Sequence, residues 1–182
     1  MKKVYFAILA LATLTLASCE KDPAGGTAVE KLSGQWYVNV QGIDEKGEVL
    51  YEDADLYGAG NFIVLTCNTE DNDPTKLFVN DLGNFWDFAV VTKCDLGANS
   101  FNVTEGEDIV NGALVTITNG KILFGAATTP SGAKADSIVF DVLFSDDPYA
   151  APNEGMPGFE SAIYDRLRMT GYRYTGFVAD EE

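Results

Sequence analysis

Residues 33–40 carry the pattern that most limits how this chain can fold. Apolar Trp36, Val38 and Val40 alternate with Gln, Tyr and Asn, so one face of the segment suits a core and the other suits water. Gly34 stands two positions before the large indole ring. A glycine there lets the chain turn sharply, or pass close to another strand, just before the ring enters the interior. The pattern predicts the first strand of a barrel.

The segment before this strand has the pattern of an export signal. Two lysines precede an apolar run over residues 4–16, which is shorter than the roughly 20 residues that a membrane-spanning helix needs. Leu16-Ala17-Ser18-Cys19 is similar to a bacterial lipobox. We therefore expect residues 1–18 to be a lipoprotein signal peptide and Cys19 to become an N-terminus acylated with chains such as palmitate. The alternative is a secretory signal with an incidental cysteine.

The residues after the lipobox predict a cellular location and a flexible linker. Glu20-Lys21-Asp22 is similar to the export tags of surface lipoproteins in the Bacteroidetes, so we expect a lipid-anchored protein of the outer membrane, on the cell surface or the periplasmic face. Residues 22–27 are small, flexible and polar. We expect residues 19–31 to be the lipidated N-terminus and linker, and residues 32–182 to form one domain.

The charge of the chain limits its partners. The formal net charge is −16, and it becomes −18 once the two lysines of the signal peptide are removed. A surface this negative repels nucleic acid and anionic head groups, so we expect no nucleic-acid partner. The chain is 46% hydrophobic, with 11 Phe and 8 Tyr, which is enough material for a core.

Short strand patterns alternate with turn signals through the rest of the chain. Asn119-Gly120 predicts a two-residue I′ turn, because both residues tolerate positive φ, and Asp81-Leu82-Gly83 predicts a second hairpin. About eight to ten short strands without an internal repeat predict an all-β fold, a single closed or nearly closed antiparallel barrel. Besides the first strand, we expect strands at residues 48–51, 61–67, 76–80, 84–92, 101–103, 115–118, 121–124, 137–144 and 168–177.

Two segments depart from simple alternation. Residues 61–67 are apolar on both faces, so we expect loops, a helix or a neighbouring molecule to cover the outer face. Residues 145–165 form a long connection punctuated by three prolines, which favours either a functional flap or a mobile segment. Its end, residues 159–167, has the composition of a short helix.

The two ends of the predicted barrel domain share a feature with lipocalins. Gly34-Gln35-Trp36 lies at the opening strand and Arg173 at the closing strand, which resembles the lipocalin arrangement in which a late arginine covers the tryptophan of a Gly-x-Trp motif. A cation over an indole face contributes ~1 to 2 kcal/mol. The resemblance implies that Gly34, Trp36 and Arg173 form the barrel floor.

A closer resemblance covers nearly the whole chain. It is carried by the stretches at residues 19–27, 34–38, 81–86, 118–123, 126–132, 135–140 and 171–176. In these stretches the chain resembles the Bacteroidetes lipoprotein family of lipid-binding putative hydrolases, a calycin-like barrel group. It departs from that family in its proline-rich segment before the last strand. The resemblance implies lipid binding.

The residues do not favour ordinary hydrolysis or a metal site. The chain has no histidine, which excludes Ser-His-Asp and Cys-His catalysis and a His-ligated zinc, and it has no Gly-x-Ser-x-Gly elbow. Glu70-Asp71-Asn72-Asp73 clusters oxygen ligands, but a calcium loop starting at Asp71 needs glycine where Lys76 stands. We expect a solvated turn there, no metal, no cofactor and no catalytic residues.

Cys67 and Cys94 are the thiols left after lipidation. An oxidising exterior allows a disulfide between them, while their apolar-rich strands allow the ordinary role of small buried hydrophobes. Both alternatives remain open from the sequence.

The expected function is binding of a lipid or another small apolar ligand in the barrel. Tyr172, Arg173 and Tyr174 are the groups expected to meet a head group. An eight-stranded barrel can be filled by its side chains or hold a ligand. The alternatives are a filled barrel whose acidic loops bind a basic protein or a polysaccharide and, third, a hydrolase. The candidate cavity residues are Trp36, Val38, Phe62, Trp86, Phe88, Phe101, Ile117, Phe140, Tyr172 and Tyr174.

The lipobox generates a direct prediction. Mass spectrometry of the native protein should find a diacyl or triacyl adduct on Cys19 at the mature N-terminus. An unmodified mature N-terminus at another residue would show that the segment is an ordinary secretory signal.

Overall fold

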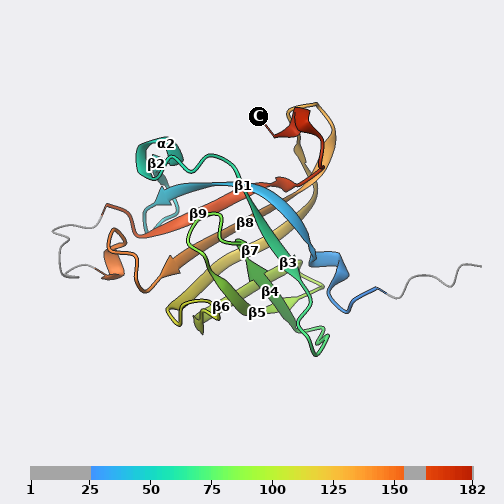
Figure 1. Ribbon diagram of the computed structural model, residues 1–182, viewed down its shortest axis with the longest axis horizontal. Coiled ribbons are helices and arrows are strands. Elements are labelled where there is room, and N and C mark those ends of the chain that lie inside the picture. The colour runs from blue at the N-terminus through green and yellow to red at the C-terminus, as the bar shows by residue number, and fades with distance from the viewer. Residues whose placement is uncertain (1–25, 154–162, 182) are drawn as a thin grey trace, which may run out of the picture.

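The computed structural model describes residues 26–153 and 163–181. In these residues the strands form one antiparallel sheet with the order β2-β1-β3-β4-β5-β6-β7-β8-β9, and β1 also pairs with β9 (Figure 1). Eight strands therefore close a barrel, and β2 extends the sheet at the end of β1. The predicted all-β antiparallel barrel is confirmed.

The strands are 4 to 15 residues long and the helices are short. No helix in the described part of the chain is long and apolar enough to cross a membrane. The strands are β1 (Gly34–Ile43), β2 (Val49–Glu52), β3 (Phe62–Cys67), β4 (Lys76–Asn80), β5 (Ala89–Asp95), β6 (Ser100–Glu107), β7 (Leu114–Thr128), β8 (Lys134–Phe144) and β9 (Arg166–Arg173). The helices are η1 (Glu30–Leu32), α2 (Asp53–Leu56), η2 (Ala151–Asn153) and η3 (Val178–Asp180).

The seam between β1 and β9 closes the barrel. The two strands pair from Trp36 with Arg173 to Ile43 with Arg166. At Gly171 a Cβ atom would lie 2.0 Å from the backbone oxygen of Tyr37, so a side chain there would force the strands apart. The close approach at this glycine is what lets β9 lie against β1.

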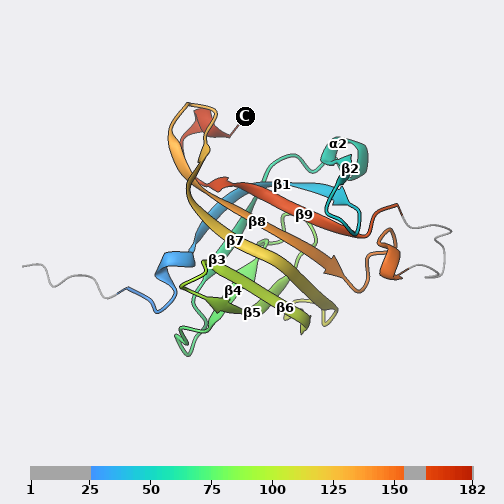
Figure 2. The same cartoon turned by 180° about the vertical axis from the view of Figure 1, so that it is seen from behind.

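The Asn119-Gly120 hairpin prediction is wrong. Residues on both sides of this pair belong to one continuous strand, β7, which crosses the whole barrel wall (Figure 2). Asn119 has a φ of 55°, as in a turn, but the pair forms a bulge opposite Phe140 of β8. The Asn119 amide donates to Asp141, and a Cβ on Gly120 would lie 2.4 Å from the Phe101 oxygen. Neighbouring strands on both sides therefore hold the dipeptide in the sheet.

Other boundaries also differ from the sequence pattern. The hairpin between β4 and β5 exists, but its loop runs over residues 81–88, so Trp86 and Phe88 precede β5 instead of lying in it. The prediction of a short helix over residues 159–167 is wrong at its C-terminal end, because β9 begins at Arg166. Residues 159–162 lie outside the described residues. The flap expected over residues 145–165 also lies partly outside them.

The barrel floor is built around Trp36. The side chain is fully buried, and its Nε1 donates to Thr66 Oγ1 at 2.8 Å, whose hydroxyl in turn donates to the Leu32 oxygen of η1. The Arg173 guanidinium carbon lies 4.5 Å from the centroid of the indole ring, so the expected cation–π contact is present. A Cβ on Gly34 would lie 2.3 Å from the same guanidinium, which explains the glycine of the Gly-x-Trp motif by space and not by φ.

This floor generates a stability prediction. Replacing Trp36 with Ala should lower the free energy of unfolding by about 2 to 4 kcal/mol, because it leaves a cavity and removes the partner of Arg173. Urea denaturation measures the change, with Gln35→Ala on the exposed face of the same strand as the matched control. A loss below about 0.5 kcal/mol, the usual effect of a surface substitution, would contradict a floor centred on this ring.

Candidate functional site

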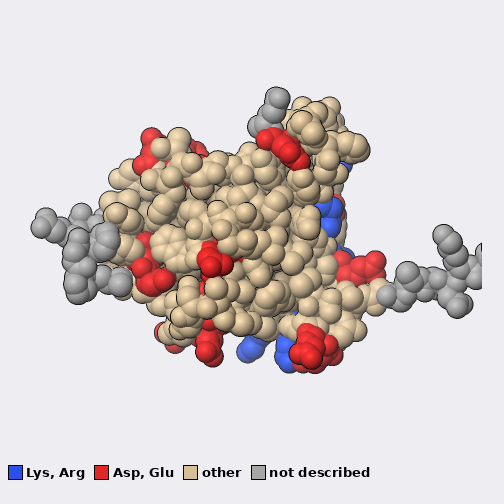
Figure 3. Space-filling model, in the orientation of Figure 1, with Lys and Arg blue, Asp and Glu red and all other residues tan. Residues whose placement is uncertain are grey.

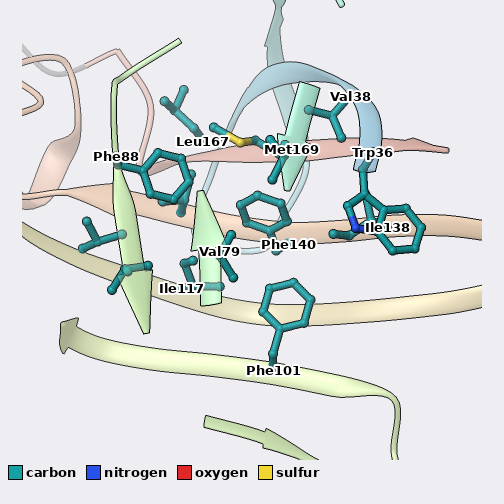
Figure 4. Close-up of a cluster of buried hydrophobic side chains, with 14 of the residues drawn as sticks. Trp36, Val38, Val79, Phe88, Phe101, Ile117, Ile138, Phe140, Leu167 and Met169 are labelled. Carbon is teal, nitrogen blue, oxygen red and sulfur yellow. The ribbon is translucent and has the colours of Figure 1, made fainter. Parts of the chain in front are cut away.

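The interior of the barrel is filled by its own side chains. The candidate cavity residues on the inner face expose between 0 and 6% of their surface and belong to one hydrophobic cluster. Figure 4 shows the labelled side chains of this cluster pointing from opposite walls toward a common centre, where the rings of Phe101 and Phe140 lie 5.7 Å apart. Side chains packed this closely leave no room for a ligand. The residues placed here are Trp36, Val38, Phe62, Phe88, Phe101, Ile117 and Phe140.

The other candidate cavity residues lie outside this interior. Trp86 is half-buried in the loop before β5. Tyr172 and Tyr174 pack with Tyr37 on the outer side of the β1–β9 seam, where the Tyr172 hydroxyl donates to the Asp180 oxygen. Arg173 is held by Asp136 and the Ser33 oxygen besides Trp36. These three seam residues are therefore occupied by structural contacts and do not form a head-group site inside the barrel.

Aromatic rings close the end of the barrel opposite the floor. Trp86 stacks on Phe144 with centroids 4.9 Å apart, and Phe85 stacks on Phe62 at 5.3 Å. The loop that presents these rings is organised by Asp81, which is fully buried and accepts five backbone N–H groups of residues 83–88 at 2.7 to 3.1 Å. Five donors compensate the burial of this carboxylate.

A chain of hydrogen bonds fixes the segment beside these rings. The hydroxyls of Tyr57 and Tyr164 bond to each other, and Tyr164 donates to Asp147 at 2.8 Å. Burial raises the pKa of Tyr57 to about 12 and also raises the pKa values of Tyr164 and Asp147. Both phenols therefore stay protonated at neutral pH and act as hydrogen-bond donors, not as bases. A hollow of about 330 Å³ lies beside them, lined by Asp55, Leu56, Tyr57, Tyr149 and Ile163.

The largest described hollow lies on the outer face of β4 and β5. We call it the outer groove; it is an open hollow of about 790 Å³. Phe78 and Val91 are cross-strand partners at its centre, and both point away from the core. Figure 3 shows the molecule in the orientation of Figure 1, with a central area mostly free of charged side chains and with acidic and basic side chains together along its lower edge. The groove is lined by Asn68, Thr69, Glu70, Asp71, Lys76, Phe78, Val91 and Ile109.

The outer groove runs along the length of β4. Lys76 begins this strand, and Ile109 lies near its end, since the Ile109 N–H donates to the oxygen of Ala89, the partner of Asn80. Five residues of strand span about 16 Å. The groove is therefore an elongated apolar surface with polar groups at the end nearer the floor.

A second hollow of about 380 Å³ adjoins the groove and shares Lys76 and Val91 with it. It extends the surface across β5 to β6, where Asn102 is the partner of Lys93. Its remaining lining residues are Thr92, Lys93, Asn102, Val103 and Thr104.

The acidic turn and the two cysteines lie around this surface. Asp71 accepts from Thr69 and pairs with Lys76 at 2.6 Å, which holds the pKa of Asp71 at about 2. No group of three or more His, Cys or acidic side chains in residues 26–153 and 163–181 could hold a metal. Cys67 and Cys94 are free thiols on β3 and β5, with β4 between these strands.

The sequence predictions missed the outer groove. Phe78 and Val91 were not among the candidate residues, and single outward-facing apolar residues on a strand are ordinary. The one signal was the apolar pattern on both faces of residues 61–67, whose outer face was expected to be covered. Cys67 at the end of this segment is the partner of Phe78, so the outward row Cys67, Phe78 and Val91 crosses three strands.

Comparison with known proteins identifies the family but not a characterised relative. The family model described as "lipid-binding putative hydrolase" matches residues 21–178, which include every strand of the barrel. A search of curated proteins gives no match. Because the match covers most of the chain, this protein belongs to the family of lipid-binding putative hydrolases.

Proposed function

We propose that this protein is a lipid-anchored lipoprotein that binds a lipid or another long apolar molecule in the outer groove, without a covalent step. The observation that carries the proposal is the outward-facing pair of half-buried Phe78 and exposed Val91, which line an elongated hollow of about 790 Å³. The family match supports lipid as the ligand class. The packed interior argues against a site inside the barrel.

The apolar area of the groove is suited to an acyl chain. Val91 is 38% exposed and Ile109 is 65% exposed, so both offer surface that a ligand can remove from water. A methylene group that is fully removed from water contributes about 0.8 kcal/mol. An open groove covers only one side of a chain, so affinity depends on contact along its whole length.

The position of the N-terminal segment fits an anchored lipid binder. The Ala28 N–H donates to Asn72 at 2.8 Å, which places the start of the described chain beside the loop at the polar end of the groove. If Cys19 carries the anchor, the short linker before Ala28 keeps this end of the groove close to the membrane. A lipid then has a short path from the bilayer to the groove.

A filled barrel also fits a second function, an interaction module that binds a basic protein or a polysaccharide. The observation that favours it is the packed interior, together with a net charge of −16. The two functions differ in whether a small apolar ligand binds saturably.

Titration with an environment-sensitive fluorescent fatty acid tests the proposal on the chain from residue 19 onward. The wild type should bind saturably, and Val91→Asp should weaken binding by at least about tenfold, because it places a charge against the acyl chain. Leu123→Asp is the matched control, since Leu123 is a similarly exposed apolar residue, at 43%, on β7 and outside the groove. Unchanged affinity in Val91→Asp would place the ligand elsewhere. No saturable binding by the wild type would favour the interaction module.

A further inference from the structure

Two lysines stand directly beside the apolar centre of the outer groove. Lys76 and Lys93 are cross-strand partners on β4 and β5, two residues along from the pair of Phe78 and Val91. All four side chains lie on the outer face, because Leu77, Val79 and Thr92 between them are buried. The surface is therefore amphipathic, with a basic row next to an apolar row.

The two lysines place like charges opposite each other, and only one of them has acidic partners among the described residues. Like charges that face each other across an antiparallel pair are destabilising. Lys76 is compensated by Asp71 at 2.6 Å and Asp73 at 3.6 Å. Lys93 forms no ion pair with any residue that the structure describes.

The nearest acid on the same strand face does not supply the missing partner. Asp95 follows Lys93 by two residues, but its Oδ1 accepts the backbone N–H groups of Gly97 and Ala98 at 2.8 and 3.0 Å. Several other described lysines also form no ion pair, so Lys93 is distinguished by its position, opposite Lys76 and next to the exposed apolar side chain of Val91. The neutral side chains of Asn102 and Thr104 line the hollow around it and can donate hydrogen bonds.

We propose that Lys93 binds the carboxylate of a long-chain fatty acid whose acyl chain lies over Phe78 and Val91. This inference rests on the proposed function and adds the ligand class. One unpaired ammonium matches one negative charge, while the overall charge of −16 disfavours head groups with several charges. The acyl chain then follows β4 toward Ile109, which keeps the carboxylate at the end of the groove near the N-terminal segment.

The test compares an acid with its neutral counterpart. Calorimetric titration of the chain from residue 19 onward uses dodecanoate and dodecanol, which share one acyl length and differ in the head group. The wild type should bind dodecanoate about fivefold more tightly, the contribution of one exposed ion pair, and added salt should reduce this preference. Lys93→Met keeps the apolar stem and removes the charge, so it should bind both ligands equally, with the dodecanol affinity of the wild type.

Lys121→Met is the matched control, because Lys121 is an exposed lysine on β7 outside both hollows. It should retain the preference for dodecanoate. Equal binding of both ligands by the wild type, or a preference that survives in Lys93→Met, would overturn the head-group inference and leave the groove as a lipid site. Failure of the wild type to bind either ligand would instead overturn the proposed function.

Discussion

The pairing of β1 with β9 is the contact on which the rest of the structure depends. It joins the first and last strands of the barrel over eight residue pairs, so neither of these strands is left with an open edge along the seam. The pairing requires glycine at position 171, where the backbone of Tyr37 leaves no space for a Cβ. It also brings Arg173 over Trp36, so the same contact that closes the wall closes the floor.

The packing inside the barrel decides where a ligand can bind. An eight-stranded barrel can be filled by its side chains or hold one small ligand, and here large rings from opposite walls meet at its centre. Both ends are covered, by η1 and Trp36 at one and by the rings around Trp86 and Phe144 at the other. A binding function that does not disrupt this core must use the outer surface. The outer groove is the largest described hollow on that surface.

The sequence predicted the architecture well because alternation and turn chemistry are local signals. Trp36, Val38 and Val40 are buried as expected, and Arg173 covers the indole ring. The Asn119-Gly120 prediction failed because positive φ is required by turns and by bulges alike. Which one forms is decided by neighbours distant in sequence, Asp141 and Phe101. The groove could not be predicted, since it depends on the register that places Phe78 opposite Val91.

The placement of the groove residues is informative because two departures from ordinary strand design coincide. An exposed apolar residue alone needs no explanation, and a surface lysine needs none either. Here an apolar pair faces outward on adjacent strands, and a pair of like charges faces outward two residues away. Strand faces in contact with water usually carry polar side chains and avoid like charges directly opposite each other. Both arrangements depart from this pattern, and such departures concentrate at functional sites. A ligand with an apolar chain and one negative charge resolves both conflicts at once, which neither a purely apolar ligand nor a polar one does.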